Sequence, residues 1–226
     1  MRQMDRQMLD IFARDKSKPQ DMTLFNARGE SLTLTLRQLT AEDFDPIRRL
    51  ELEIVAGIPN NDTENIYQSF EEDSLRYALG TGYAFAMYQG EIPAAFVYMI
   101  PRPPLEHNVL TDVAQEVGLV KWNEKDVDGQ AEMMDQGNTW EYDPAIHDVM
   151  IADCIIVDKR FRGYGLQRLL FGLMDAMAQA EGLHRLCGTA SPKNAYSIRN
   201  FEASGYRCVA VKPKYRSERC FFVKEL

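Results

Sequence analysis

The sequence predicts an α/β fold in which a mixed, mostly antiparallel twisted sheet is flanked by helices. Strand-like segments joined by short turns, 22–25 with 31–36 and 83–88 with 92–100, are one indication, because they read as antiparallel hairpins. Another is a strand, glycine-rich turn, helix and strand within residues 149–190, whose strands should be parallel and joined by a right-handed crossover. The chain is long enough to bury the core of one domain, which we place over residues 1–226.

The first hundred residues alternate between helical and strand-like spacing of apolar side chains. The expected elements are a helix over 2–14, strands 22–25 and 31–36, helices over 44–54 and 61–79, and strands 83–88 and 92–100. Thr40, followed three residues later by Asp43, is typical of a helix start. Core-facing helical side chains should be Met4, Met8, Ile11, Phe12, Phe44, Ile47, Leu50, Ile54, Ile66, Phe70 and Tyr77. Residues 1–30 form an N-terminal helix and hairpin extension of the domain.

Acidic residues are concentrated in one segment of the chain. There are 26 Lys and Arg against 34 Asp and Glu, a net charge of -8. Residues 105–148 hold eleven acidic and two basic residues, a net charge of -9, which leaves +1 for the rest. This segment is too long for an ordinary connection, so it is an insertion or a lid, with a helix over 109–117. Its charge would attract a cationic amine, although a solvated acidic excursion explains it equally well.

The pattern is more regular from residue 149 onward. An apolar strand over 149–157 is interrupted by Asp153. The next helix has apolar residues at 166, 169, 170, 173, 174 and 177 and should end near Gly182. We expect a strand over 186–190, a helix over 194–204, and a final pair of strands over 207–211 and 219–223.

A glycine-rich turn joins the strand over 149–157 to the helix that follows it. It reads Arg160-Phe161-Arg162-Gly163-Tyr164-Gly165-Leu166-Gln167. Glycines allow a tight turn, and the helix adds unpaired N–H groups and the positive end of its dipole, which together suit a pyrophosphate. The Gly-Lys-Ser/Thr of a Walker loop is absent, and a dinucleotide fingerprint would need glycine where Arg168 stands. A glycine turn without a ligand is the simple alternative.

A second motif follows one helix and one strand later. Residues 191–206 read SPKNAYSIRNFEASGY, in which Asn194 opens a helix that closes in Gly205-Tyr206. Taken alone, this could be an ordinary N-capped helix with Ile198 and Phe201 in the core. The R-x-x-G-x-G loop and this motif, in this order and at this separation, resemble the two signatures of the GNAT (N-acetyltransferase) superfamily. The resemblance covers residues 149–226, and the earlier residues match the family only in pattern.

The resemblance implies a GNAT-like fold with acetyl-CoA, the co-substrate, held where strand 149–157 parts from strand 186–190. It also implies acetyl transfer to a primary amine of a small molecule or peptide. The implied acetyl-CoA-binding residues are Ile155, Ile156 and Val157 along the pantetheine, Arg160, Arg162, Gly163, Tyr164, Gly165, Leu166 and Gln167 around the pyrophosphate, and Asn194, Ser197 and Phe201 toward the pantetheine or acetyl end. Either arginine could equally be solvated.

One departure from the family pattern concerns the proton donor. The family's frequent tyrosine, seven residues after Asn194, is Phe201 here, and a phenyl ring cannot donate a proton. Ser197, Tyr196 or water could act instead, or the thiolate could leave unaided. Asp153 is the first candidate base, because a carboxylate in an apolar strand needs an explanation, and a structural pair with an arginine is the alternative. Further candidates are Glu141, Asp143 and Asp148.

Other features limit the remaining partners and classes. We expect reduced core cysteines in a cytoplasmic protein, because Cys154, Cys187, Cys208 and Cys220 lack metal or redox spacing. The spacing of the histidines argues against a metal site, and the short apolar runs argue against a membrane span. The excess of acidic residues argues against a nucleic-acid partner. A homodimer is a possible assembly. Two rival hypotheses stay open: a non-catalytic acyl-CoA-binding or regulatory module, suggested by Phe201, and an oligomeric scaffold with an incidental glycine turn.

Overall fold

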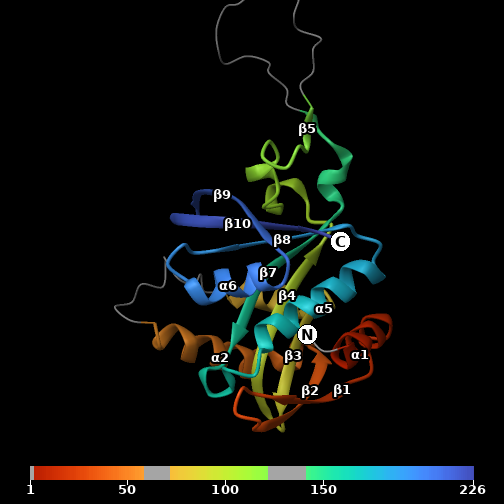
Figure 1. Cartoon of the computed structure of the whole chain (residues 1–226), viewed down its shortest axis with the longest axis vertical. Coiled ribbons are helices and arrows are strands. Elements are labelled where there is room, and N and C mark those ends of the chain that lie inside the picture. The colour runs from red at the N-terminus through yellow and green to blue at the C-terminus, as the bar shows by residue number, and fades with distance from the viewer. Residues whose placement is uncertain (1–2, 59–71, 122–140) are drawn as a thin grey trace, which may run out of the picture.

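The computed structural model describes residues 3–58, 72–121 and 141–226 and is built around one large sheet (Figure 1). Its eight strands lie in the order β1 (Gln20–Phe25), β2 (Ser31–Gln38), β3 (Ala84–Gln89), β4 (Ile92–Pro101), β7 (Val149–Val157), β8 (Arg185–Ala190), β10 (Ser217–Glu225) and β9 (Arg207–Lys214). Neighbouring strands are antiparallel except β7 and β8, which are parallel. The predicted mixed, mostly antiparallel sheet is therefore confirmed.

Helices cover both faces of the sheet. They are α1 (Gln3–Arg14), α2 (Phe44–Ala56), α4 (Glu72–Gly80), α5 (Leu166–Ala180) and α6 (Ala195–Ala203). Side chains alternate along β4, so that Ala95 and Val97 join the core under α1 and α5, while Phe96 and Tyr98 join the core under α2 and α4. We call these the α5 face and the α2 face. Phe201 of α6 belongs to the core of the α5 face.

Two predicted core positions in the helices are wrong. Tyr77 is 70 % exposed on α4, and Ile11 is exposed on α1. Leu75 and Leu79 fill the buried side of α4, so the apolar face is rotated away from Tyr77. The first part of the helix predicted over 61–79, with Ile66 and Phe70, lies outside the described residues.

The described part of the acidic segment is packed against the α2 face of the sheet. It contains short elements only: η3 (Leu105–His107), η4 (Thr111–Val113), β5 (Val120–Lys121), β6 (Glu141–Tyr142) and η6 (Pro144–His147). The helix predicted over 109–117 is wrong, because a single 3₁₀ turn stands in its place. Leu110 and Val113 still become buried, against Phe221 and Val223 of β10. Burial of these apolar groups holds the segment to the sheet without a regular helix.

Several of the acids in this segment form contacts within the protein. Asp112 pairs with Lys214 at 2.5 Å, and Glu116 pairs with Lys212 at 2.7 Å. Both lysines belong to β9, so these ion pairs join the insertion to the edge of the sheet. The negative charge of the described part is thus partly used to hold the insertion in place.

None of the four cysteines forms a disulfide bond. Cys154, Cys187 and Cys220 are buried, but Cys208 is exposed on β9, so the expectation of core cysteines is wrong for that residue. Among the described residues, no helix combines the length and the apolar character needed to cross a membrane.

An aromatic cluster joins α5, α6 and β10. The Phe201 ring stacks on Phe222 with centroids 4.4 Å apart and lies 4.6 Å from the ring of Phe171. Its tip lies over Gly188 of β8, where a Cβ would be 3.1 Å from Cζ of Phe201 and 3.3 Å from the Cβ of Ala152. Gly188 therefore allows the ring to pack directly on the sheet backbone.

Replacing Gly188 with Ala should destabilise the protein by overpacking. The expected loss in the free energy of unfolding is about 1–3 kcal/mol, measured by urea denaturation. Phe201→Leu shortens the opposing side chain, so the double variant should be more stable than the sum of the single effects predicts, by more than about 0.5 kcal/mol. Strict additivity would show that the methyl group does not meet the Phe201 ring.

Candidate functional site

The parallel strands at the centre of the sheet part halfway along β7. Their pairing runs from Val149 with Arg185 to Ala152 with Gly188, whereas β7 continues to Val157 on its other partner, β4. Among the described residues, no strand pairs with the β8 side of β7 beyond Ala152. Backbone N–H and C=O groups along that edge are therefore free to bind an extended ligand as an added strand would.

Asp153 is the extra residue of a β-bulge at the point of divergence. On β4, Tyr98 pairs with Cys154 and Met99 pairs with Ala152, so Asp153 has no residue opposite it. A bulge bends its strand and turns the affected side chain, and bulges are common beside functional sites. This bulge follows directly after the last β7–β8 pair.

Asp158 fixes the loop that leaves β7. Its carboxylate accepts hydrogen bonds from the backbone N–H of Arg160 at 2.8 Å and from Nε of the same arginine at 2.9 Å. Desolvation would raise the pKa of Asp158, but the hydrogen bonds from Arg160 hold it below its usual value. The guanidinium of Arg160 is thus bound to Asp158 within the loop. Arg162 is exposed.

The two glycines of the loop adopt left-handed backbone conformations. Gly163 has φ 92° and Gly165, the N-cap of α5, has φ 77°. Such angles are accessible to glycine at no steric cost, whereas other L-residues are strained there. They turn the chain into α5, whose first N–H groups and positive dipole end meet the loop. With Arg162 and Arg168 exposed nearby, these groups fit a pyrophosphate.

A polar network joins the start of α5 to α6. The side chain of Gln167 donates to Ser197 Oγ at 3.3 Å and accepts from the amide of Asn200 at 2.7 Å. Asn194 Oδ1 accepts from the backbone N–H of Ser197 at 3.0 Å and so caps α6. The structure therefore brings the predicted residues Gln167, Asn194 and Ser197 together beside the glycine loop.

Two other predicted residues of α6 lie away from this network. Tyr196 is 76 % exposed, and the guanidinium of Arg199 lies 5.0 Å over its ring. Phe201 is buried in the aromatic cluster, as the simpler interpretation of this helix proposed.

Asp153 lies near three titratable groups that are distant from it in sequence, His107, Tyr98 and Tyr215. Solvent reaches the residue, yet the surrounding protein desolvates its carboxyl and raises its pKa, while the positive potential of His107 opposes this rise. Desolvation and then the negative potential of Asp153 raise the pKa of Tyr98, and the same two causes raise that of Tyr215 to about 12. Within the described part of the chain, Asp153 forms no ion pair with an arginine, so a structural pairing does not explain it.

Tyr215 reaches this site from the turn between β9 and β10. Lys214 pairs with Ser217, which leaves Tyr215 and Arg216 as a two-residue turn with φ 53° and 63°. Asn-Gly is the usual choice in such a turn, and two ordinary residues there store backbone strain. The strands predicted over 207–211 and 219–223 are shorter than β9 and β10, so the prediction did not include this turn. The only signal was a short polar stretch without glycine between two strands.

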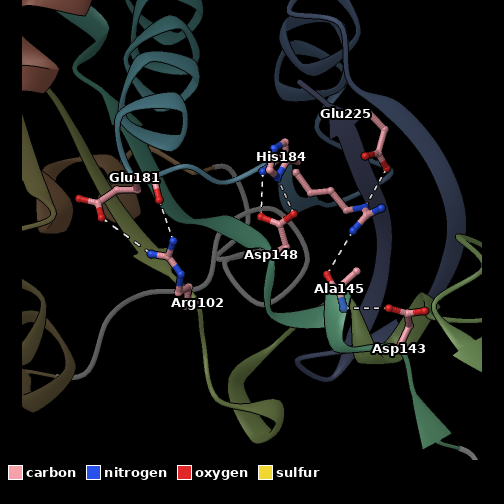
Figure 2. A network of polar contacts seen from close by, with 8 residues as sticks. Arg102, Asp143, Ala145, Asp148, Glu181, His184 and Glu225 are labelled. Carbon is pink, nitrogen blue, oxygen red and sulfur yellow. Dashed lines mark hydrogen bonds and ion pairs between the residues drawn. The ribbon is translucent and has the colours of Figure 1, made fainter.

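The structure gives structural contacts to two of the alternative bases. Asp143 accepts from the backbone N–H of Ala145 at 2.9 Å, and Asp148 accepts from the backbone N–H of His184 at 3.0 Å (Figure 2). The ring Nδ1 of His184 lies 2.7 Å from the same Asp148 carboxylate. Both acids precede β7, at the end of the strand opposite to the glycine loop. Of the candidate bases with described side chains, Asp153 is the one at the divergence of β7 and β8.

The fold has many counterparts among solved structures. No family model and no curated protein matches the sequence. The GNAT domain of an S. lividans protein named PAT superposes with a TM-score of 0.56 at 14% identity, covering 91% of this chain and 97% of that one. The ribosomal-protein-S18-alanine N-acetyltransferase of Escherichia coli gives a TM-score of 0.52 at 16% identity, with 85% and 93% covered.

A further structural neighbour was determined with coenzyme A. The NatC complex bound to Gag peptide and CoA gives a TM-score of 0.53 at 12% identity, covering 85% of this chain and 98% of that one. At such identities the likeness concerns the fold. The resemblance first seen in two sequence motifs thus extends to the whole sheet, and this chain has the fold of the GNAT acetyltransferases.

Proposed function

We propose that the protein transfers an acetyl group from acetyl-CoA to a primary amine of a small molecule or peptide. The observation that carries this proposal is the divergence of β7 from β8. Beyond it, β7 leads into the glycine loop and the start of α5. Acetyl-CoA has an extended pantetheine chain that leads to a pyrophosphate. The chain matches the open edge of β7, and the pyrophosphate matches the anion site at the glycine loop. Structural neighbours named as acetyltransferases support the same chemistry.

The proposed binding mode assigns a task to each part of the α5 face. The pantetheine would pair with the backbone of Ile155, Ile156 and Val157. The pyrophosphate would accept hydrogen bonds from the backbone N–H groups of residues 162–167. Arg162 would be the nearby cation in place of Arg160, which is bound to Asp158. Asn194 and Ser197 would contact the pantetheine or acetyl end through the α5–α6 network.

Asp153 would remove the proton that the attacking amine must lose. The amine nitrogen forms a bond to the acetyl carbon, the bond from that carbon to sulfur breaks, and the thiolate leaves with the electron pair. A raised pKa makes the Asp153 carboxylate a better proton acceptor than an ordinary aspartate. Backbone N–H groups near Val157 would stabilise the oxyanion. Because Phe201 has no acidic proton, water would protonate the thiolate, either directly or through the hydroxyl of Ser197, which takes up one proton from water as it gives up another.

The presence of Phe201 also favours a second candidate function, a module that binds acyl-CoA without turnover. Both candidates predict acetyl-CoA binding, but this one predicts that no amine accelerates CoA release. An assay of free thiol across an amine panel separates the two. Failure to bind acetyl-CoA in calorimetry would exclude both.

Replacing Gly163 with Ala should weaken acetyl-CoA binding. The left-handed φ costs an L-residue about 1–2 kcal/mol, so the loop would leave the binding conformation and the Kd should rise about tenfold in calorimetry. Gly182→Ala is the matched control, because Gly182 has φ 67° with nothing near its missing Cβ and lies at the other end of α5. Equal Kd values for both variants would argue against the loop as the binding site.

Replacing Asp153 with Asn should abolish turnover and raise thermal stability. The loss in kcat should be about 10²–10⁴-fold, with acetyl-CoA affinity unchanged. A raised folded-state pKa means that ionisation of Asp153 destabilises the native state, so wild-type stability falls as pH rises through that pKa. The Tm of the variant should therefore exceed that of wild type at neutral pH, and the difference should vanish in acid.

Asp148→Asn provides the matched control for the Asp153 variant. It removes one carboxylate just before the same strand but also weakens the contact with His184, so it should lower Tm and leave kcat near the wild-type value. Full activity in the Asp153 variant would exclude this residue as the base.

A further inference from the structure

The most unusual charged group in the molecule is the guanidinium of Arg219. The residue lies in β10 and is 7 % exposed. Its Nε has no hydrogen-bond partner, and neither does the buried Oγ of Ser217, two residues earlier on the strand. Within the described residues Arg219 forms no ion pair, whereas the half-buried Arg37 is paired with the carboxylate of Asp43.

Arg219 and Ser217 lie on the α2 face of the sheet. Side chains alternate along a strand, so residues 217, 219, 221 and 223 share one side of β10. Phe221 and Val223 pack against the insertion on the α2 face, while Phe222 packs against α5. The two unpartnered polar groups therefore lie on the same face as the Tyr98–Asp153 environment.

The position of Arg219 relative to Asp153 follows from the strand order. β10 neighbours β8, and β8 neighbours β7, so two strand spacings, about 10 Å, are the least separation of the two residues across the sheet, and the divergence of β7 from β8 adds to it. Cys220 pairs with Ala190, two residues beyond the point where β7 leaves β8. Tyr215 lies within the electrostatic influence of both groups, because the negative potential of Asp153 raises its pKa and the positive potential of Arg219 lowers it. Arg219 thus stands across the same site from Asp153.

An uncompensated buried charge destabilises a folded protein, so this arrangement calls for a counter-ion. A planar guanidinium beside a hydroxyl group matches the two oxygens of a carboxylate. One cation neutralises one monoanion, whereas a dianionic phosphate would leave excess negative charge in a buried site.

We propose that Arg219 and Ser217 bind a carboxylate of the acceptor, which is therefore an amino-acid-like zwitterion with its amine directed to Asp153. The inference rests on the proposed function and names the substrate class of that site. It replaces a polyamine or other purely cationic acceptor, whose second cation would face Arg219. Because the two groups are at least about 10 Å apart across the sheet, the amine and the carboxylate should be separated by several bonds.

Paired acceptors differing in one group test the proposal. The zwitterions are glycine, 4-aminobutyrate, 6-aminohexanoate and glycylglycine, each compared with the amine that lacks its carboxylate, and 1,4-diaminobutane represents a polyamine. Isothermal titration to the protein measures binding without turnover, and CoA release measures transfer. At least one zwitterion should bind tenfold or more tightly than its amine counterpart. Preference for the diamine, or for 3-aminopropylphosphonate over 4-aminobutyrate, would overturn the proposal, as would equal binding within every pair.

Arg219→Gln should erase this preference. The Kd of the preferred zwitterion should rise about 30-fold, while binding of the matching amine stays the same. Arg216→Gln is the matched control, because it removes an equal charge from an exposed residue in the adjacent turn and should change neither value. Ser217→Ala should give a smaller loss than Arg219→Gln.

Stability distinguishes recognition from a structural role for Arg219. Removing an unpaired buried charge should raise the Tm of Arg219→Gln above wild type, whereas a structural arginine would lower it. If that variant does not fold, the role is structural and the proposal fails. Acetyl-CoA binding without carboxylate selectivity overturns only this inference. Arg219-dependent carboxylate binding without acetyl-CoA binding overturns the proposed function instead.

Discussion

The end of parallel pairing at Ala152 and Gly188 is the constraint on which the rest of the site depends. Two parallel strands that stayed paired would leave no backbone group between them for a ligand. The bulge at Asp153 bends β7 away from β8, and the Phe201 ring occupies the space beside Gly188 on the α5 face. The divergence is therefore part of the packed core.

The divergence also connects the two faces of the sheet. On the α5 face lie the glycine loop and the Gln167–Ser197 network, which suit a long anionic ligand. On the α2 face lie Asp153, Tyr215 and Arg219, which suit a small polar one. Because Phe201 is built into the aromatic core, the polar residues that we propose for the acceptor lie on β10 and its turn, far in sequence from the family's usual tyrosine position.

Sequence periodicity was sufficient for most of the sheet, because strand alternation and helical spacing are local properties. The glycine loop and the Asn194 cap were also predictable, since each is encoded within a few adjacent residues. The orientation of Tyr77 was not, because the buried side of a short helix is chosen by the neighbours it meets. The contact between Arg160 and Asp158 was not predicted, although the residues are two apart. An arginine in a phosphate-loop motif can bind either the phosphate or a neighbouring carboxylate, and the motif does not specify which. Arg219 and Tyr215 became visible only when the β9–β10 hairpin was placed beside β8.

Net charge would be a poor guide to the acceptor that we propose. Asp112 and Glu116 of the insertion are paired with lysines of β9, so part of the field of the insertion is neutralised locally. Exposed charges at longer range are screened by salt within about 10 Å. A buried guanidinium keeps its full influence, because few solvent dipoles surround it. In the proposed site, one unpartnered arginine would therefore have more effect on which acceptor binds than the surplus of surface carboxylates, and it would favour an acceptor that brings its own negative charge.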